Sequence, residues 1–355
     1  MSTFSEFRQA WPRPSRPLPI VMVGTGGIVE HAHLPTYRRL GFEVKGVYDL
    51  DAQRSADVAE RFAVNKVYAS LDEAAGEREV IFDLAVPAAA IASVLEKLPE
   101  RAAVLIQKPL GENLEQARAI AGLCRDKSLV AAVNFQLRYS PNILALTDVL
   151  ERGLLGEPID LEVRINTETP WQRWEFLRGI ARLELLYHSI HYLDLVRALL
   201  GEPRGVLCRA LGDPALIEYA ETRSATILDY GARCRVLVSA NHGHRYGSRH
   251  AMSALKLEGT RGAAVAELGV NLDYPEGRPD TLELALGGEP TWQTIPLRGS
   301  WFIEAFEGPM SNLQRFVLGE DSKLCTSVDD ALKTMAVVEA CYLSTNAPAT
   351  PILEV

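Results

Sequence analysis

A strand, a glycine-rich turn and a helix follow one another near the start of this 355-residue chain. The apolar run 19–23 stops at a turn, and a helical pattern extends to residue 40. The turn and the first helical residue are Gly24, Thr25, Gly26, Gly27 and Ile28. A second apolar run, 43–48, ends at Asp49. This order is typical of the first unit of an α/β fold with a parallel sheet.

The alternation of strands and helices continues to about residue 137. Further apolar runs cover 80–86, 103–106 and 129–134. The helical patterns between them cover 52–62, 89–98 and 114–126. This predicts a doubly wound parallel sheet with helices on both faces, over residues 18–137. Residues 1–17, which contain three prolines, are expected to form a flexible or loosely docked N-terminal arm.

The glycine turn favours a dinucleotide site, although glycines with this spacing also occur in plain turns. Glycines let the N–H groups of a helix N-terminus approach a pyrophosphate. Asp49 lies about twenty residues further on, where a carboxylate can accept hydrogen bonds from the adenosine ribose. Asp49 and Asp51 would repel a 2′-phosphate and Arg54 would attract it, so the sequence favours NAD over NADP.

Residues 138–355 show a different pattern, in which short segments of alternating hydrophobicity have the spacing of hairpins. These segments cover 205–211, 223–228, 234–240, 253–258, 263–268, 281–286 and 292–296. Helices are expected over 141–152, 303–318 and 328–344, and around the stretch 186–195. The pattern predicts an α+β domain with a large, mostly antiparallel open sheet.

Composition excludes several classes of protein. A net charge of −9 argues against a nucleic-acid partner, which needs a concentrated basic face. The five cysteines are scattered without a Cys-x-x-Cys pair, which indicates reduced thiols and neither a disulfide framework nor a zinc site. No apolar run approaches the roughly 20 residues of a membrane span, and the N-terminus lacks a signal-peptide pattern. We expect a cytoplasmic protein that binds a small molecule.

Three further stretches carry polar groups at positions that suit a ligand site. The first, IQKPL (106–110), follows a strand, and the carboxyl ends of parallel strands line the ligand cleft of such folds. The second, NFQLRYSP (134–141), follows the last parallel strand. The third, LYHSIHYLDL (186–195), places two histidines, two tyrosines and an aspartate in an otherwise apolar helix.

Together with the glycine turn, these stretches resemble the Gfo/Idh/MocA family (glucose-fructose oxidoreductase, inositol dehydrogenase and rhizopine catabolism proteins) over nearly the whole chain from about residue 18. The resemblance implies a Rossmann domain that binds NAD(P), and a pocket for a sugar, cyclitol or related polyol. It also implies a homodimer or homotetramer formed through the open sheet. The implied cofactor-binding residues beyond the turn are Asp49, Arg54, Val86, Pro87, Gln107, Lys108, Asn134 and Gln136.

The Glu-Lys-Pro motif of the family falls on Gln107, Lys108 and Pro109, which implies that Lys108 contacts both cofactor and substrate. Because Gln107 replaces the usual glutamate, Lys108 loses a neighbouring negative charge and is easier to deprotonate. An isolated lysine in such a sequence would instead be a solvated surface residue.

The helix motif of the family, a histidine three residues before an aspartate, falls on His191 and Asp194. At 100° per residue, Tyr187 lies within about 60° of both. The resemblance implies that His191 takes the hydroxyl proton and that Asp194 orients or helps to charge the site. The residues alone also allow a core pair of His191 with Asp194. Tyr187 is then either a proton donor and relay or pocket wall.

Substrate contacts are expected from side chains that stack on sugar rings or hydrogen-bond to hydroxyls and carboxylates. They are Lys108, Gln136, Arg138, Trp171, Arg173, Trp174, His188 and His191. The tryptophans could alternatively be exposed oligomer contacts, and His188 a structural contact. We expect no metal site, because His188 and His191 lack a third ligand with recognisable spacing. The remaining paired histidines, His31 with His33 and His242 with His244, are expected in loops.

The leading interpretation is an NAD-dependent oxidoreductase that moves a hydride between nicotinamide and a secondary alcohol or ketone of a carbohydrate-like molecule. Lys108 would polarise the oxygen and His191 would act as acid or base. Two alternatives are a non-redox lyase or glycosidase that recycles NAD, and a non-catalytic sugar-sensing regulator on the same fold. Turnover and net NAD consumption separate the three.

Overall fold

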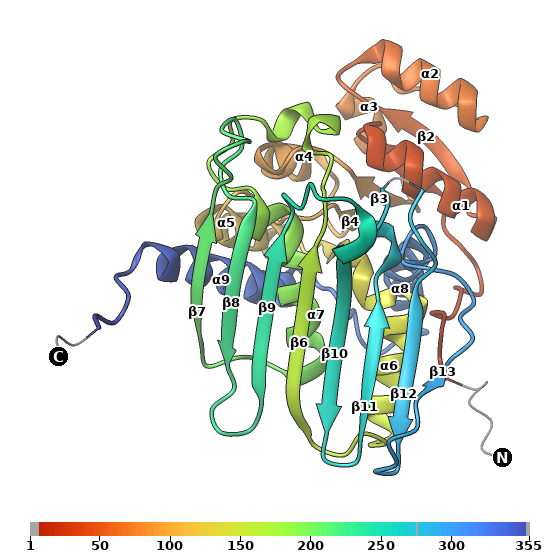
Figure 1. The fold of residues 1–355 in the computed structure, drawn as a ribbon. Helices are drawn as coiled ribbons and strands as arrows, with labels where there is room; N and C mark the ends of the chain where they lie inside the picture. The colour runs from red at the N-terminus through yellow and green to blue at the C-terminus, as the bar shows by residue number, and fades with distance from the viewer. Residues whose placement is uncertain (1–6, 275, 353–355) are drawn as a thin grey trace.

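The computed structural model describes residues 7–274 and 276–352 and shows two domains around two sheets (Figure 1). The predicted fold class is confirmed. Sheet A has five parallel strands in the order β2-β1-β3-β4-β5, and sheet B has eight in the order β13-β12-β11-β10-β6-β9-β8-β7. Within the described ranges, no helix is both long and apolar enough to cross a bilayer. The cytoplasmic location stays a prediction.

Sheet A follows the predicted alternation of strands and helices. Its strands are β1 (Ile20–Val23), β2 (Val44–Tyr48), β3 (Ile81–Leu84), β4 (Ala103–Ile106) and β5 (Val130–Val133). The helices are α1 (Leu34–Leu40), α2 (Ala52–Phe62), α3 (Leu71–Ala75), α4 (Ile91–Lys97) and α5 (Leu114–Asp126). A π-helical turn (Val29–His33) precedes α1, and a 3₁₀ turn (Ala88–Ala90) precedes α4. Short α3 was not predicted.

Both faces of sheet A are buried, as expected for a doubly wound sheet. Successive residues of a strand point to opposite faces. Ile20 and Met22 join the core beneath α1, together with Met310 of a helix that comes from the second domain. Val21 and Val23 belong to the larger core on the other face. Sheet A is therefore fixed to the second domain as well as to its own helices.

Sheet B is mostly antiparallel, with β6 and β9 parallel. Its strands are β6 (Pro158–Asn166), β7 (Gly205–Leu211), β8 (Arg223–Asp229), β9 (Arg235–Asn241), β10 (Met252–Gly259), β11 (Gly262–Glu267), β12 (Thr281–Leu286) and β13 (Gln293–Thr294). The helices of this half are α6 (Pro141–Glu151), α7 (Ile190–Leu200), α8 (Glu307–Val317) and α9 (Val328–Asn346). Helices α6, α7 and α9 lie behind the sheet in Figure 1. Leu207 and Ile227 are exposed. Oligomerisation through this sheet stays a prediction.

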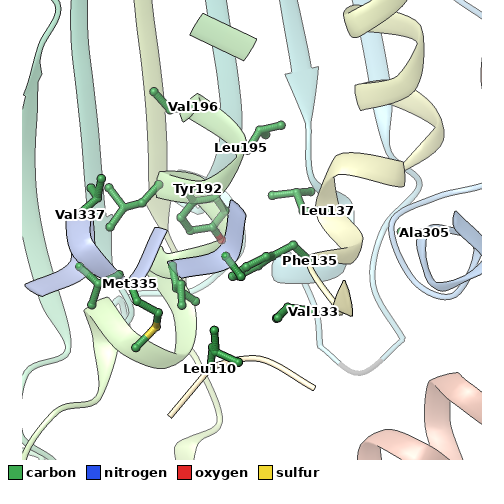
Figure 2. Close-up of a cluster of buried hydrophobic side chains, with 14 of the residues drawn as sticks. Leu110, Val133, Phe135, Leu137, Tyr192, Leu195, Val196, Ala305, Met335 and Val337 are labelled. Carbon is green, nitrogen blue, oxygen red and sulfur yellow. The ribbon is translucent and has the colours of Figure 1, made fainter. Parts of the chain in front are cut away.

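Side chains from both domains meet in one buried cluster (Figure 2). Val133 and Phe135 come from the end of β5, Tyr192 from α7 and Met335 from α9. All four are almost completely inaccessible to solvent. This packing holds α7 against the carboxyl edge of sheet A, where Lys108 also lies.

The described part of the N-terminal arm, residues 7–17, lies along the second domain. Trp11 donates a hydrogen bond to Asp321 Oδ2 at 2.8 Å, and its ring packs edge-on against Tyr139 at 5.2 Å. The main-chain N–H of Arg8 donates to Asp148 Oδ2 at 3.1 Å. Residues 1–6 of the predicted arm lie outside the described residues.

Candidate active site

The turn after β1 has the shape of a phosphate cradle. Gly24 has φ +94°, and a Cβ there would lie 2.3 Å from the carbonyl oxygen of Ala85, so only glycine fits. A Cβ on Gly26 would meet nothing within 4 Å. The helix that starts at Gly27 cannot satisfy its own first N–H groups, and its N-terminus carries partial positive charge. An anion such as a pyrophosphate suits this space.

Asp49 closes the cradle from the end of β2. Its Oδ2 accepts hydrogen bonds from the N–H and the hydroxyl of Thr25 at 2.7 and 3.0 Å. Asp51 caps α2 by accepting from the N–H of Arg54, whose guanidinium lies 3.4 Å from the same carboxylate. The charge of Arg54 is therefore partly offset by Asp51. The cradle and Asp49 fit a dinucleotide without a 2′-phosphate.

Lys108 reaches from the end of β4 to the second domain. Its Nζ donates a hydrogen bond to the carbonyl oxygen of Tyr187 at 2.8 Å. Burial lowers the pKa of Lys108 to about 8. The main-chain N–H of Lys108 donates to Gln107 Oε1 at 3.2 Å. The lysine is thus held where the two domains meet, in a state that loses its proton more easily than usual.

Two histidines lie close to Lys108. Burial lowers the pKa of His191 well below its ordinary value, and the charge of Lys108 lowers it further. Burial, together with His242, Lys108 and His191, has the same effect on the pKa of His188. His191 Nδ1 is buried without a hydrogen-bond partner in the described part of the chain. Both rings are therefore neutral near pH 7, the form that can accept a proton.

The stretch that contains these histidines departs from the regular helix used in the sequence analysis. Leu185–Ser189 forms a π-helical turn, and α7 begins only at Ile190. The assumed angle of 100° per residue therefore does not hold across Tyr187. The ring of Tyr187 packs against Phe176 at 6.0 Å, and burial and the charge of Glu112 raise the pKa of Tyr187. The contact that Tyr187 makes with Lys108 is through its main chain.

This contact leads to a prediction for Tyr187→Phe. The substitution keeps the carbonyl that accepts from Lys108, and the described residues offer the hydroxyl no hydrogen bond. We therefore expect turnover within about threefold of the wild type, because a volume-conserving change removes only an unpaired hydroxyl. Steady-state kinetics would check this. A tenfold or larger loss would instead place the hydroxyl on the proton path.

Asp194 and Arg138, expected in the site, are engaged with each other. Arg138 Nε donates to Asp194 Oδ2 at 2.6 Å and Nη2 to Oδ1 at 2.5 Å. Arg138 also binds Asp330 and the carbonyl of Cys325, and Thr334 donates to Asp194. All three guanidinium nitrogens of Arg138 are thus used within the protein. The described residues show no hydrogen bond between His191 and Asp194. The contact between Asp194 and Arg138 ties α7 to the segment after β5, and a catalytic role for Asp194 stays a prediction.

The loop that carries the expected tryptophans lies beside His188. Trp171 is 1% exposed and packs edge-on against His188 at 4.7 Å, so it is not a surface residue. Trp174 lies 6.3 Å from His188 and 5.3 Å from Tyr274. Arg173, in contrast, is exposed. A cavity of about 450 Å³ opens beside this loop and is lined by Trp171, Tyr274, His242, Arg245, Arg278 and Glu168, among others.

The expectation that the paired histidines lie in loops is wrong for His31 and His33, which lie in the π-helical turn Val29–His33. His242 lies in a turn after β9, as expected, but it is buried. His33 is 1% exposed, lies in the π-helical turn before α1 and bonds Asp83 Oδ2 through Nδ1 at 2.7 Å. His242 is also 1% exposed and bonds Thr169 through Nδ1 at 2.8 Å. Neither contact can be read from the sequence, because the partners are 50 and 73 residues away along the chain.

Several buried polar atoms near these residues have no hydrogen-bond partner within the described ranges. They are Asn134 Oδ1, Gln136 Oε1, His191 Nδ1, Trp171 Nε1 and Trp301 Nε1. Trp301, which the sequence analysis missed, packs edge-on against His191 at 5.6 Å. Buried polar groups are nearly always paired, so each of these atoms can take a partner from a ligand, an ion or water. The amide oxygens are acceptors and the indole nitrogens are donors.

The sequence was compared with protein families and with known proteins. The Gfo/Idh/MocA model, an oxidoreductase family with an NAD-binding Rossmann fold, matches residues 18–135. D-apiose dehydrogenase of Paraburkholderia graminis is 25% identical over 333 residues, which are 90% of this chain and 85% of that protein.

Solved structures show the same fold across both domains. An oxidoreductase from Agrobacterium radiobacter, in complex with NAD+, L-tartaric acid and magnesium, has a TM-score of 0.77 and 21% identity, covering 93% of this chain and 96% of that one. Levoglucosan dehydrogenase, in complex with NADH and levoglucosan, has a TM-score of 0.76 and 17% identity, covering 93% and 97%.

Proposed function

We propose that this chain, whose residues 18–135 belong to the Gfo/Idh/MocA oxidoreductase family, transfers a hydride between NAD and a secondary alcohol or ketone of a sugar, cyclitol or related polyol. The observation that carries the proposal is the position of Lys108 at the carboxyl edge of sheet A, next to His191 with its unpaired Nδ1. The similar proteins named as sugar dehydrogenases support this substrate class.

Residues of the first domain would hold the cofactor. The cradle at Gly24–Gly27 would bind the pyrophosphate and Asp49 the adenosine ribose. The loop after β3, at Val86 and Pro87, borders the cradle, since Ala85 contacts Gly24. The free amide oxygens of Asn134 and Gln136 suit the amide N–H groups of nicotinamide. When bound, NAD supplies the hydride acceptor.

Lys108 and His191 would have different roles at the reacting carbon: Lys108 would polarise the oxygen and His191 would accept the proton. An ammonium group has three N–H donors, and Lys108 uses one of them on Tyr187. The others can donate to the reacting oxygen and stabilise the charge that develops there. His191, neutral because it is buried, can accept the hydroxyl proton. His188 would form the wall of the pocket together with Trp171.

A screen of sugars, polyols and sugar acids with NAD tests the proposal. We expect NADH to accumulate in equal amount to a ketone product for at least one compound. Product formation without net NADH would indicate a lyase or glycosidase that recycles the cofactor. Binding without any product would indicate a regulator.

The geometry around Asp49 predicts a preference for NAD over NADP. Asp49 and Asp51 would face a 2′-phosphate, and Arg54 already lies beside Asp51. We expect NAD to bind at least about tenfold more tightly, because a like charge at close range is costly. Fluorescence titration with both cofactors would check this. Asp49→Asn should reduce the difference in affinity between NAD and NADP. Tighter binding of NADP by the wild type would contradict it.

The lowered pKa of Lys108 predicts the pH dependence of alcohol oxidation. Lys108 loses its positive charge as the pH rises through about 8, and a neutral amine polarises an oxygen more weakly. We expect kcat/KM to fall above about pH 8, with no acidic limb from His191 near neutrality. In Lys108→Arg the falling limb should move to higher pH. A wild-type profile that stays flat or rises to about pH 9.5 would contradict this role.

A further inference from the structure

Several hydrogen-bond donors near the reacting centre have no acceptor among the described residues. Lys108 Nζ keeps N–H groups beyond the one bonded to Tyr187. Trp301 Nε1 and Trp171 Nε1 are buried and unpaired, in side chains that are 6% and 1% exposed. An indole N–H can only donate. A hydroxyl group both donates and accepts, whereas a carboxylate accepts only.

The two indoles that carry these donors pack against the histidines near Lys108. Trp301 packs against His191 at 5.6 Å, and Trp171 packs against His188 at 4.7 Å. The positive charge of Lys108 contributes to the lowered pKa of both histidines. These contacts place one indole beside each of the two histidines.

No ion pair with a carboxylate balances Lys108, His188 or His191 among residues 7–274 and 276–352. Asp194 and Glu184, the two acidic groups of the same stretch of chain, contact other residues. Asp194 is paired with Arg138. Glu184 accepts from Ser189 through Oε1, which also lies 3.5 Å from His242 Nε2, and Glu184 Oε2 has no hydrogen-bond partner among the described residues.

We propose that the substrate carries a carboxylate next to the carbon that is oxidised, as in an aldonate or another sugar acid. This proposal rests on the proposed function and narrows its substrate class. The carboxylate would accept from Lys108 and from the indole N–H of Trp301. It would supply a negative charge beside Lys108, which has no carboxylate partner among the described residues.

Matched pairs of acid and neutral polyol test this inference. D-gluconate and D-glucitol differ only at one terminal carbon, as do D-galactonate and galactitol. We expect kcat/KM for NAD reduction to be about tenfold to a hundredfold higher for the acid of at least one pair, the usual strength of a hydrogen bond to a charged group. The acid of that pair should also bind more tightly than its neutral partner to the enzyme loaded with NADH. Neutral partners that equal or exceed the acids in both measurements would overturn the inference.

The two measurements separate this inference from the proposed function. Turnover of neutral polyols alone would uphold the oxidoreductase and reject the carboxylate. Preferential binding of acids to the NADH complex without turnover of any compound would uphold the carboxylate and reject the oxidoreductase.

Trp301→Phe tests the indole N–H, because phenylalanine keeps an aromatic ring, although a smaller one, and has no donor. We expect the ratio of acid to neutral affinity to fall by about threefold or more. Trp292 is 43% exposed and provides the control, so Trp292→Phe should leave the ratio unchanged. A thermal melt confirms that both variants fold. An unchanged ratio in folded Trp301→Phe would remove Trp301 from the carboxylate site.

Discussion

Replacement of Lys108 by Met is expected to lower turnover by about a hundredfold or more. Methionine nearly matches the length of the lysine side chain but has no N–H donor, so the reacting oxygen loses a preorganised partner. The fold should tolerate the change, because a partly buried ammonium is replaced by an apolar group. Steady-state kinetics, together with cofactor titration, would separate lost chemistry from lost NAD binding.

Lys127→Met is the matched control for this experiment. Like Lys108, Lys127 donates from Nζ to a main-chain carbonyl, that of Glu96 at 2.6 Å, but it lies at the end of α5. We expect turnover close to the wild type in this variant. Near-normal turnover in Lys108→Met would remove the lysine from catalysis.

Asp194→Ala is expected to lower the free energy of unfolding by about 3–5 kcal/mol. The Asp194 side chain is 1% exposed and that of Arg138 is 12% exposed. Removal of the carboxylate leaves the guanidinium of Arg138 partly buried with one fewer partner, and removes the hydrogen bond between Asp194 on α7 and Thr334 on α9. Urea unfolding would measure the loss.

An exposed pair of the same type provides the comparison. Arg125 and Asp329 lie 3.0 Å apart with side chains 59% and 72% exposed, so Asp329→Ala should cost at most about 1 kcal/mol. A cost for Asp194→Ala as small as this would contradict the anchoring role. Collapse of turnover at an unchanged free energy of unfolding would return Asp194 to the catalytic machinery.

Most of the fold was predictable, because its signals are local. The glycine turn and the carboxylate at Asp49 identified the first domain, and helices α2 and α5 have the predicted bounds. The central strand β6 was missed, although its alternation of buried Leu161, Val163 and Ile165 with more exposed residues is visible in the sequence. The π-helical turn at Leu185–Ser189 has no such signal, because it depends on the packing around it.

The site was only partly predictable, for a physical reason. Lys108 and His191 follow from the family motifs, and the structure brings them together. The partner of Asp194 could not be predicted, because a buried carboxylate pairs with whichever cation the fold brings near it, here Arg138 from 56 residues away. Trp301 lies in a loop without a recognisable motif. Its proximity to His191 is a property of the tertiary structure alone.

Hydride transfer itself can be followed with an isotopic label. A substrate found in the screen would be deuterated at the carbon that carries the reacting hydroxyl and incubated with NAD and the wild-type protein. We expect the deuterium to appear at C4 of the nicotinamide ring, in equal amount to the ketone product. Deuterium that stays in the product, or is released to water while no NADH accumulates, would contradict the assignment as an NAD-dependent oxidoreductase.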